Sequence, residues 1–315
     1  MDKLSKEEKQ REKQRIALEA KLNKELATVP KSATASMGLL AVDSKGLFKM
    51  SDNRWVKALA LSDASTVKEA VGKLPCRLRL TSMYSEGDQR SYLSLIGYSD
   101  SITEIRKTFD EACEVLRSAG TVYNALSVDS TMNAIAKNYG VKDSFNLASA
   151  VRKKKSFKDM VSKAPDSEED SAFTLGEIFS SVYFTKICDK GFSSPIPALV
   201  NAGLSFITAL DIAPMKGKTL MDYKKLLEAH YDRQVPSLND GQMVNVSLYI
   251  MPLAESDEAK EAIESILYRL FPENGITIAP LFGLQREGEE SIMTLGLIDS
   301  TYMRMLRIDE AVTLI

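Results

Sequence analysis

Residues 243–251, with the sequence MVNVSLYIM, predict the fold class more clearly than any other stretch. Apolar side chains alternate along this segment, which is the pattern of a β-strand. Ser256 then offers a good N-cap, so a helix is expected to follow. The break at 272–275 ends that helix, and a short strand is expected at 276–279. Apolar residues recur along the helix at helical spacing, namely Ile263, Ile266, Leu267 and Leu270.

Strands and helices alternate in a similar way through the rest of the chain. Residues 37–61 predict a β-meander, and residues 77–98 predict a hairpin that is followed by a helix at 101–118. A further strand is expected at 204–212, with a helix behind it at 217–232. This order predicts an α+β fold with mixed sheets and packed helices. Helical crossovers of this length are expected to join parallel strands.

The composition indicates a globular protein with a substantial core. Among 315 residues, 44% are hydrophobic and 27% are charged. The 41 basic and 43 acidic residues give a net charge of −2, which argues against a protein that coats nucleic acid. Three widely spaced cysteines suit a reducing compartment, and the charged start lacks the apolar core of a signal peptide. We therefore expect a cytoplasmic protein.

Residues 1–35 predict a charged N-terminal helix, because Lys, Arg and Glu alternate there and Gly is absent. Leu18, Leu22 and Leu26 form a thin apolar stripe along it. The stripe is either a docking face for a partner or part of a solvated leader. The rest of the chain divides into a first α+β lobe at 36–162, an acidic linker or loop at 163–172 and a second α+β lobe at 173–315.

The strongest chemical motif in the sequence is incomplete. Lys216, Lys218 and Thr219 resemble the end of a phosphate-binding P-loop, but Ile212 stands where that motif needs its first glycine. Nucleotide binding through this turn remains one alternative. A nucleic-acid-binding accessory protein of a mobile element, using the basic run at 152–155, is another. The single histidine, His230, is expected on a helix surface, and we expect no catalytic, cofactor-binding or metal-binding residues.

Several short words occur in a recognisable order along the second half. They are VYFTKI at 182–187, PALV at 197–200, a strand at 204–214 that ends in an I-x-P turn, VSLYI at 246–250 and TLGL at 294–297. With the meander near the N-terminus, this order resembles the N-terminal region of the assembly ATPases of type IV secretion and conjugation machines, the TraC/TraE-like family. Gly296 stands where that family usually has proline.

The resemblance covers residues 37–65 and 172–313, and it implies a non-catalytic interaction and assembly module of a conjugative DNA-transfer machine. The Walker A and Walker B elements of that family do not occur in these 315 residues, so ATP hydrolysis carries over to no residue. If the chain were a fragment, the full protein would be an ATPase. The implied partners are other secretion components and further copies of the chain, at the cytoplasmic face of the bacterial inner membrane. Direct DNA binding is not expected.

Two apolar stretches are the expected docking surfaces of such a module. The first is the stripe on the N-terminal helix, and the second lies within residues 196–200. The residues that we expect to bind partners are Leu18, Leu22, Leu26, Ile196, Leu199 and Val200.

Overall fold

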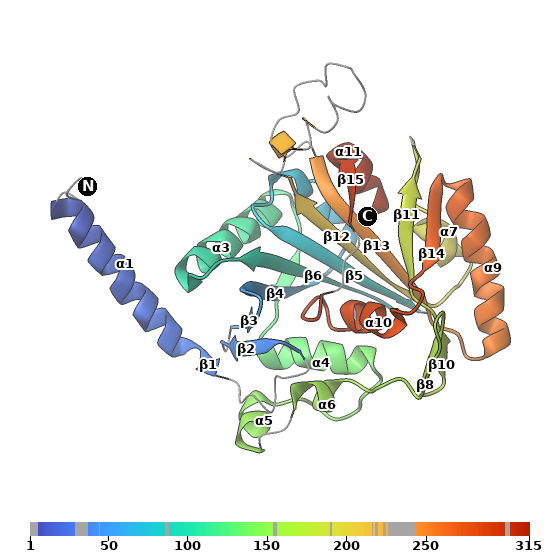
Figure 1. The fold of residues 1–315 in the computed structure, drawn as a ribbon, viewed down its shortest axis with the longest axis horizontal. Coiled ribbons are helices and arrows are strands. Elements are labelled where there is room, and N and C mark those ends of the chain that lie inside the picture. Colours follow the sequence, from blue (N-terminus) through green and yellow to red (C-terminus); the bar gives the residue numbers. More distant parts are fainter. Residues whose placement is uncertain are drawn as a thin grey trace.

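The computed structural model describes residues 6–28, 37–43, 45–85, 88–153, 156–189, 191–215, 217, 220–222, 225, 243–299 and 303–315. In these described residues twelve strands form one sheet, in the order β1-β2-β3-β4-β6-β5-β12-β13-β11-β14, with β7 beside β4 and β15 beside β13 (Figure 1). Helices pack on both faces of this sheet, so the predicted α+β class is confirmed. The helix expected at 217–232 lies mostly outside the described residues.

The first half of the sheet has the strand order of a split βαββαβ motif. The strands lie in the order β7-β4-β6-β5, and short 3-10 turns replace the first helix. In chain order the elements are β4 (Arg54–Leu61), η1 (Ala64–Val67), η2 (Val71–Lys73), β5 (Arg77–Ser85), β6 (Asp88–Tyr98), α3 (Ile102–Ser118) and β7 (Tyr123–Ala125).

The second half repeats the same topology. Its strands lie in the order β14-β11-β13-β12, so the chain contains two ferredoxin-like units joined edge to edge through β5 and β12. The elements are β11 (Tyr183–Cys188), α7 (Ile196–Asn201), β12 (Phe206–Pro214), β13 (Met243–Pro252), α9 (Asp257–Glu273) and β14 (Ile276–Pro280).

The expectation of mixed sheets with adjacent parallel strands is wrong for the described residues, where every strand pairing is antiparallel. The crossover connections exist, but each one joins two strands that have another strand between them in the sheet. β13 lies between β11 and β12, and β6 lies between β4 and β5. A crossover pattern in sequence does not reveal whether another strand later inserts between the two that it joins.

The remaining elements extend and cover the two units. The predicted meander is confirmed as β2, β3 and β4, and the acidic segment 163–172 contains a short strand, β8, that pairs with β9. These elements are α1 (Lys6–Glu25), β1 (Ala27–Thr28), β2 (Leu39–Val42), β3 (Leu47–Met50), α4 (Val128–Asn138), α5 (Leu147–Lys153), α6 (Phe157–Val161), β8 (Ser167–Glu168), β9 (Phe173–Leu175), β10 (Ile178–Ser180), α10 (Gln285–Met293), β15 (Arg304–Arg307), α11 (Ile308–Ala311) and η3 (Val312–Leu314).

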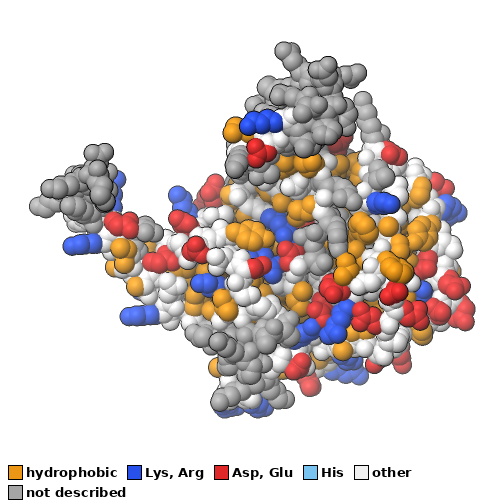
Figure 2. All heavy atoms as spheres, in the orientation of Figure 1, with side chains coloured by type: hydrophobic (Ala, Val, Ile, Leu, Met, Phe, Trp, Pro, Cys, Tyr) orange, Lys and Arg blue, Asp and Glu red, His pale blue; other side chains and the backbone are white. Residues whose placement is uncertain are grey.

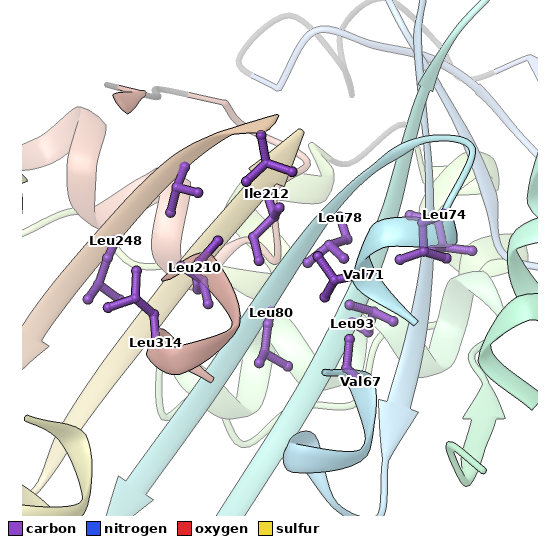
Figure 3. Close-up of a cluster of buried hydrophobic side chains, with 14 of the residues drawn as sticks. Val67, Val71, Leu74, Leu78, Leu80, Leu93, Leu210, Ile212, Leu248 and Leu314 are labelled. Atoms are coloured by element: carbon purple, nitrogen blue, oxygen red, sulfur yellow. The ribbon is translucent and has the colours of Figure 1, made fainter. Parts of the chain in front are cut away.

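A separate hydrophobic core fills each face of the sheet, and both cores contain residues from both units. The first core lies under α3, α7, α9 and α11, and the second lies under α4, α5, α6 and α10. Figure 3 shows the first core crossing the seam, where Leu80 of β5 and Leu210 of β12 lie near Leu314. The two lobes expected from sequence therefore share one sheet and continuous cores.

Gly46 fixes the turn between β2 and β3 against the segment that follows β7. Its φ is +84°, and a Cβ added there would lie 1.9 Å from the carbonyl oxygen of Leu126. Gly176 also has a positive φ, of +63°, but a Cβ there would meet nothing within 4 Å. A substitution at Gly46 therefore causes both backbone strain and steric overlap, whereas a substitution at Gly176 causes backbone strain alone.

We expect Gly46→Ala to lower the free energy of unfolding by about 2 kcal/mol, since it adds overlap to the left-handed backbone cost. Gly176→Ala carries the backbone cost alone and is expected to lose about 1 kcal/mol. Urea unfolding of both variants measures the difference. Equal losses would show that the turn does not press on Leu126.

Candidate interaction surfaces

A single carboxylate of α1 caps the first turn of α3. The Oε1 atom of Glu19 accepts a hydrogen bond from the backbone N–H of Ile102 at 2.8 Å. Its Oε2 atom accepts one from the Ser101 hydroxyl at 2.8 Å and others from Thr103. The first N–H groups of a helix lack partners within it, and its positive end favours a negative charge. Glu19 thus completes the cap that Ser101 begins by accepting from Glu104 N–H.

The same contacts stabilise the charged form of Glu19. Burial alone would raise the pKa of this carboxyl, but the hydrogen bonds from Thr103 and Ser101 lower it below its ordinary value. The attachment of α1 is therefore formed at neutral pH.

The rest of α1 extends away from the body as an arm (Figure 1). Its C-terminal part is anchored by Leu22 and Leu26, which pack against the first core. Ile16 is 55% exposed and Leu18 is 45% exposed. Figure 2 shows hydrophobic, basic and acidic side chains along this arm. The arm thus presents apolar side chains to a potential partner.

The structure divides the predicted docking residues between the surface and the core. Leu18 and Val200 are exposed, and Val200 is 41% exposed. Leu199 is completely buried, and Leu22, Leu26 and Ile196 pack on the first core, so none of these four forms a fully open surface. Sequence reasoning could not separate them, because an apolar stripe has the same pattern whether the chain's own core or a partner covers it.

Two contributors to the arm were missed from sequence. Ile16 interrupts a run of charged residues, which was a readable signal for an exposed apolar side chain. Glu19 gave no such signal, since its role depends on the start of α3, some eighty residues further along the chain. Only the folded arrangement brings the two together.

A hollow of about 580 Å³ lies beside Val200, between α7 and the turn of the β5–β6 hairpin. Tyr84 and Leu204 line it, and the Tyr84 ring stacks on Phe206 with their centroids 4.6 Å apart. Val200 therefore adjoins an amphipathic depression, whereas its neighbour Leu199 points into the core.

A second hollow, of about 500 Å³, separates α1 from the exposed face of α3. Leu22 lines its α1 side, and Asp110, Glu111 and Glu114 lie on its α3 side. We call this hollow, bounded by Leu22, Arg106, Lys107, Asp110, Glu111 and Glu114, the α1–α3 groove.

Buried charges cross the seam between the two units. Asp211 of β12 lies opposite Arg79 of β5 in the strand register, and its Oδ2 accepts from Arg79 Nη2 at 2.7 Å. Its Oδ1 accepts from Arg77 Nη2 at 2.6 Å. Burial alone would raise the pKa of Asp299, but Arg77 and Arg79 lower it to about 2. This cluster is shielded from solvent, which suits a structural role at the seam.

The remaining sequence candidates do not form a described site. Lys216, Lys218, Thr219 and His230 lie outside the described residues. In the basic run, Arg152 and Lys153 are exposed at the end of α5, whereas Lys154 and Lys155 are not described. Lys158, close to that run, pairs with Glu290 on α10.

Among the described residues, no group of His, Cys, Asp and Glu side chains is arranged to hold a metal ion. None of the helices in that part of the chain has the length and hydropathy needed to cross a membrane.

No protein-family model matches this chain, and neither does any curated protein sequence. The arm, the groove and the hollow at Val200 therefore have to be interpreted from their own chemistry.

Proposed function

We propose that this protein is a non-catalytic interaction and assembly module, similar in role to the N-terminal region of a conjugation ATPase. One observation carries the proposal: α1 projects from the sheet, is attached through Glu19, and leaves Ile16 and Leu18 exposed. Contiguous exposed apolar surface marks protein–protein contact sites, and Ile16 and Leu18 supply exposed apolar surface on two sides of the ordered helix.

The scaffold supports this proposal. Two ferredoxin-like units, joined by pairing of β5 with β12, form one continuous sheet that supports both the arm and the hollow beside Val200. Within the proposal, the module docks other components of a type IV secretion machine at the cytoplasmic face of the inner membrane. The Val200 hollow is the second contact.

The test is binding to purified inner-membrane components of such a machine, measured by calorimetry. We expect Ile16→Asp with Leu18→Asp to weaken binding at least about tenfold, because both side chains would carry charge into an apolar contact. Val122→Asp is the matched control, since Val122 is 64% exposed and lies between α3 and β7, away from the arm.

Binding that survives the double substitution would contradict the role of the arm. Absence of binding to every component would overturn the assignment to a secretion machine.

A further inference from the structure

The α1–α3 groove carries surplus negative charge. Arg106 donates to Asp43 at 3.1 Å, so the carboxylate of Asp43 partly neutralises its positive charge. Asp110 and Glu111 are exposed and form no ion pair among the described residues. Glu114 adds a third carboxylate, and Lys107 is the remaining cation of the groove. A cationic segment with some apolar surface fits this groove.

The arm of the same chain has that chemistry. Residues 6–17 contain five basic and three acidic residues, a net charge of +2. Arg11 and Lys13 are exposed on it, and the exposed apolar residues Ile16 and Leu18 follow directly. The basic arm is therefore complementary in charge to the acidic groove. Both surfaces also have apolar side chains, which the groove contributes through Leu22.

The arm cannot reach the groove of its own chain in this conformation, because α1 is one continuous helix that leads away from α3 (Figure 1). An isolated helical segment of about 12 residues is also only marginally stable in water, so packing against another surface would stabilise it. A second copy offers the same groove, and a reciprocal contact between two copies is self-complementary.

We propose that two copies of this chain associate by laying the N-terminal half of each α1 in the α1–α3 groove of the other. The proposal rests on the proposed function and deepens it, because it names one partner of the arm. The contact closes on itself, so the product is a dimer and not a filament.

Charge reversal on the two sides provides the test. The first variant reverses the arm with Arg11→Glu and Lys13→Glu, and the second reverses the groove with Asp110→Lys and Glu111→Lys. Each variant alone would place like charges together in its own dimer and is expected to raise the dissociation constant at least about tenfold. In an equimolar mixture both contacts become complementary again, so a mixed dimer is expected.

Analytical ultracentrifugation of purified chains, across a concentration series at low and high salt, measures the association. The wild type should dimerise more weakly as salt rises, because the charges involved are exposed. Lys68→Glu with Lys163→Glu makes the same change in net charge as the arm variant, at exposed sites away from the arm, and should dimerise like the wild type. Circular dichroism checks that every variant keeps its helix content.

Three results would overturn the proposal. They are a wild type that stays monomeric up to its solubility limit, reversed variants that still dimerise, and a mixture that stays monomeric although each variant is folded. A monomeric wild type that binds vesicles containing anionic lipid through the arm would assign the arm to a membrane surface instead. Because these measurements use the purified chain alone, their failure leaves binding to other components as a separate question.

Discussion

Asp211→Asn is expected to lower the free energy of unfolding by about 3–5 kcal/mol, the usual cost of removing one partner from a buried ion pair. Asp211 is completely buried and accepts from both Arg77 and Arg79. The neutral amide would leave two buried guanidinium groups with Asp299 as their remaining carboxylate. Uncompensated buried charge is what makes this change costly.

Unfolding in guanidinium chloride at neutral pH measures the loss of stability, and two further variants serve as comparisons. Asp100→Asn makes the same chemical change at an exposed position and should alter stability little. Arg79→Met combined with Asp211→Leu removes both charges of the cross-strand pair and should cost less than Asp211→Asn alone. An Asp211→Asn protein within 1 kcal/mol of the wild type would contradict a structural role for the cluster.

The position of this pair also explains how the two units keep their register. Asp211 and Arg79 face each other across the seam, while Leu210 and Leu80 face each other on the opposite side of the sheet. A shift of the pairing register by one residue would place the Asp211 side chain on the face of the sheet that carries the first hydrophobic core. The charges therefore act against misalignment of two edges that both carry apolar residues.

The sequence predicted the elements of this seam but not the charge cluster. Alternation of Leu78 and Leu80 with arginines predicts a strand that has one solvated face. In the structure, segment 294–299 and α10 cover that face, and Arg54 donates to the carbonyl oxygens of Gly296 and Leu297. Asp211, a lone charge in an apolar strand, was the signal that could have pointed to a buried partner.

The helices were predictable from the local sequence, whereas the order of the strands was not. Ser101 and Ser256 cap α3 and α9 as their local sequence predicts, because capping involves residues three positions apart. Strand order depends on contacts between distant segments, which local patterns do not encode. The helical structure of the arm was accordingly predictable, but which of its apolar residues are exposed and which pack on the core was not.

Glu289→Gln is expected to stabilise the protein by about 3 kcal/mol at pH 7. Glu289 lies on α10 and is 1% exposed, and neither carboxyl oxygen has a hydrogen-bond partner among the described residues. Burial and, to a smaller extent, the nearby charge of Glu290 raise the pKa of this carboxyl to about 8, against opposing effects from Tyr139, Lys158 and Arg286. The folded protein therefore holds a proton on Glu289 at neutral pH.

The sign of the pH dependence follows from that proton. In the unfolded chain Glu289 ionises near its ordinary pKa of 4.5, whereas in the folded chain it ionises near 8. The folded state binds more protons between these values, so this residue makes the free energy of unfolding fall as pH rises from about 4.5 to 8. Each pKa unit of difference is worth about 1.4 kcal/mol, which gives the expected 3 kcal/mol at pH 7.

Glutamine removes this dependence, since its amide stays neutral in both states and can donate a hydrogen bond toward Tyr139. Urea unfolding between pH 4 and 9 should show the variant and the wild type converging near pH 4 and separating as pH rises. Glu287→Gln, an exposed change on the same helix, should leave the pH profile almost unchanged. If Glu289→Gln kept the slope of the wild type, Glu289 would be ionised in the folded protein, and the α4–α10 interface would have to contain a compensating partner.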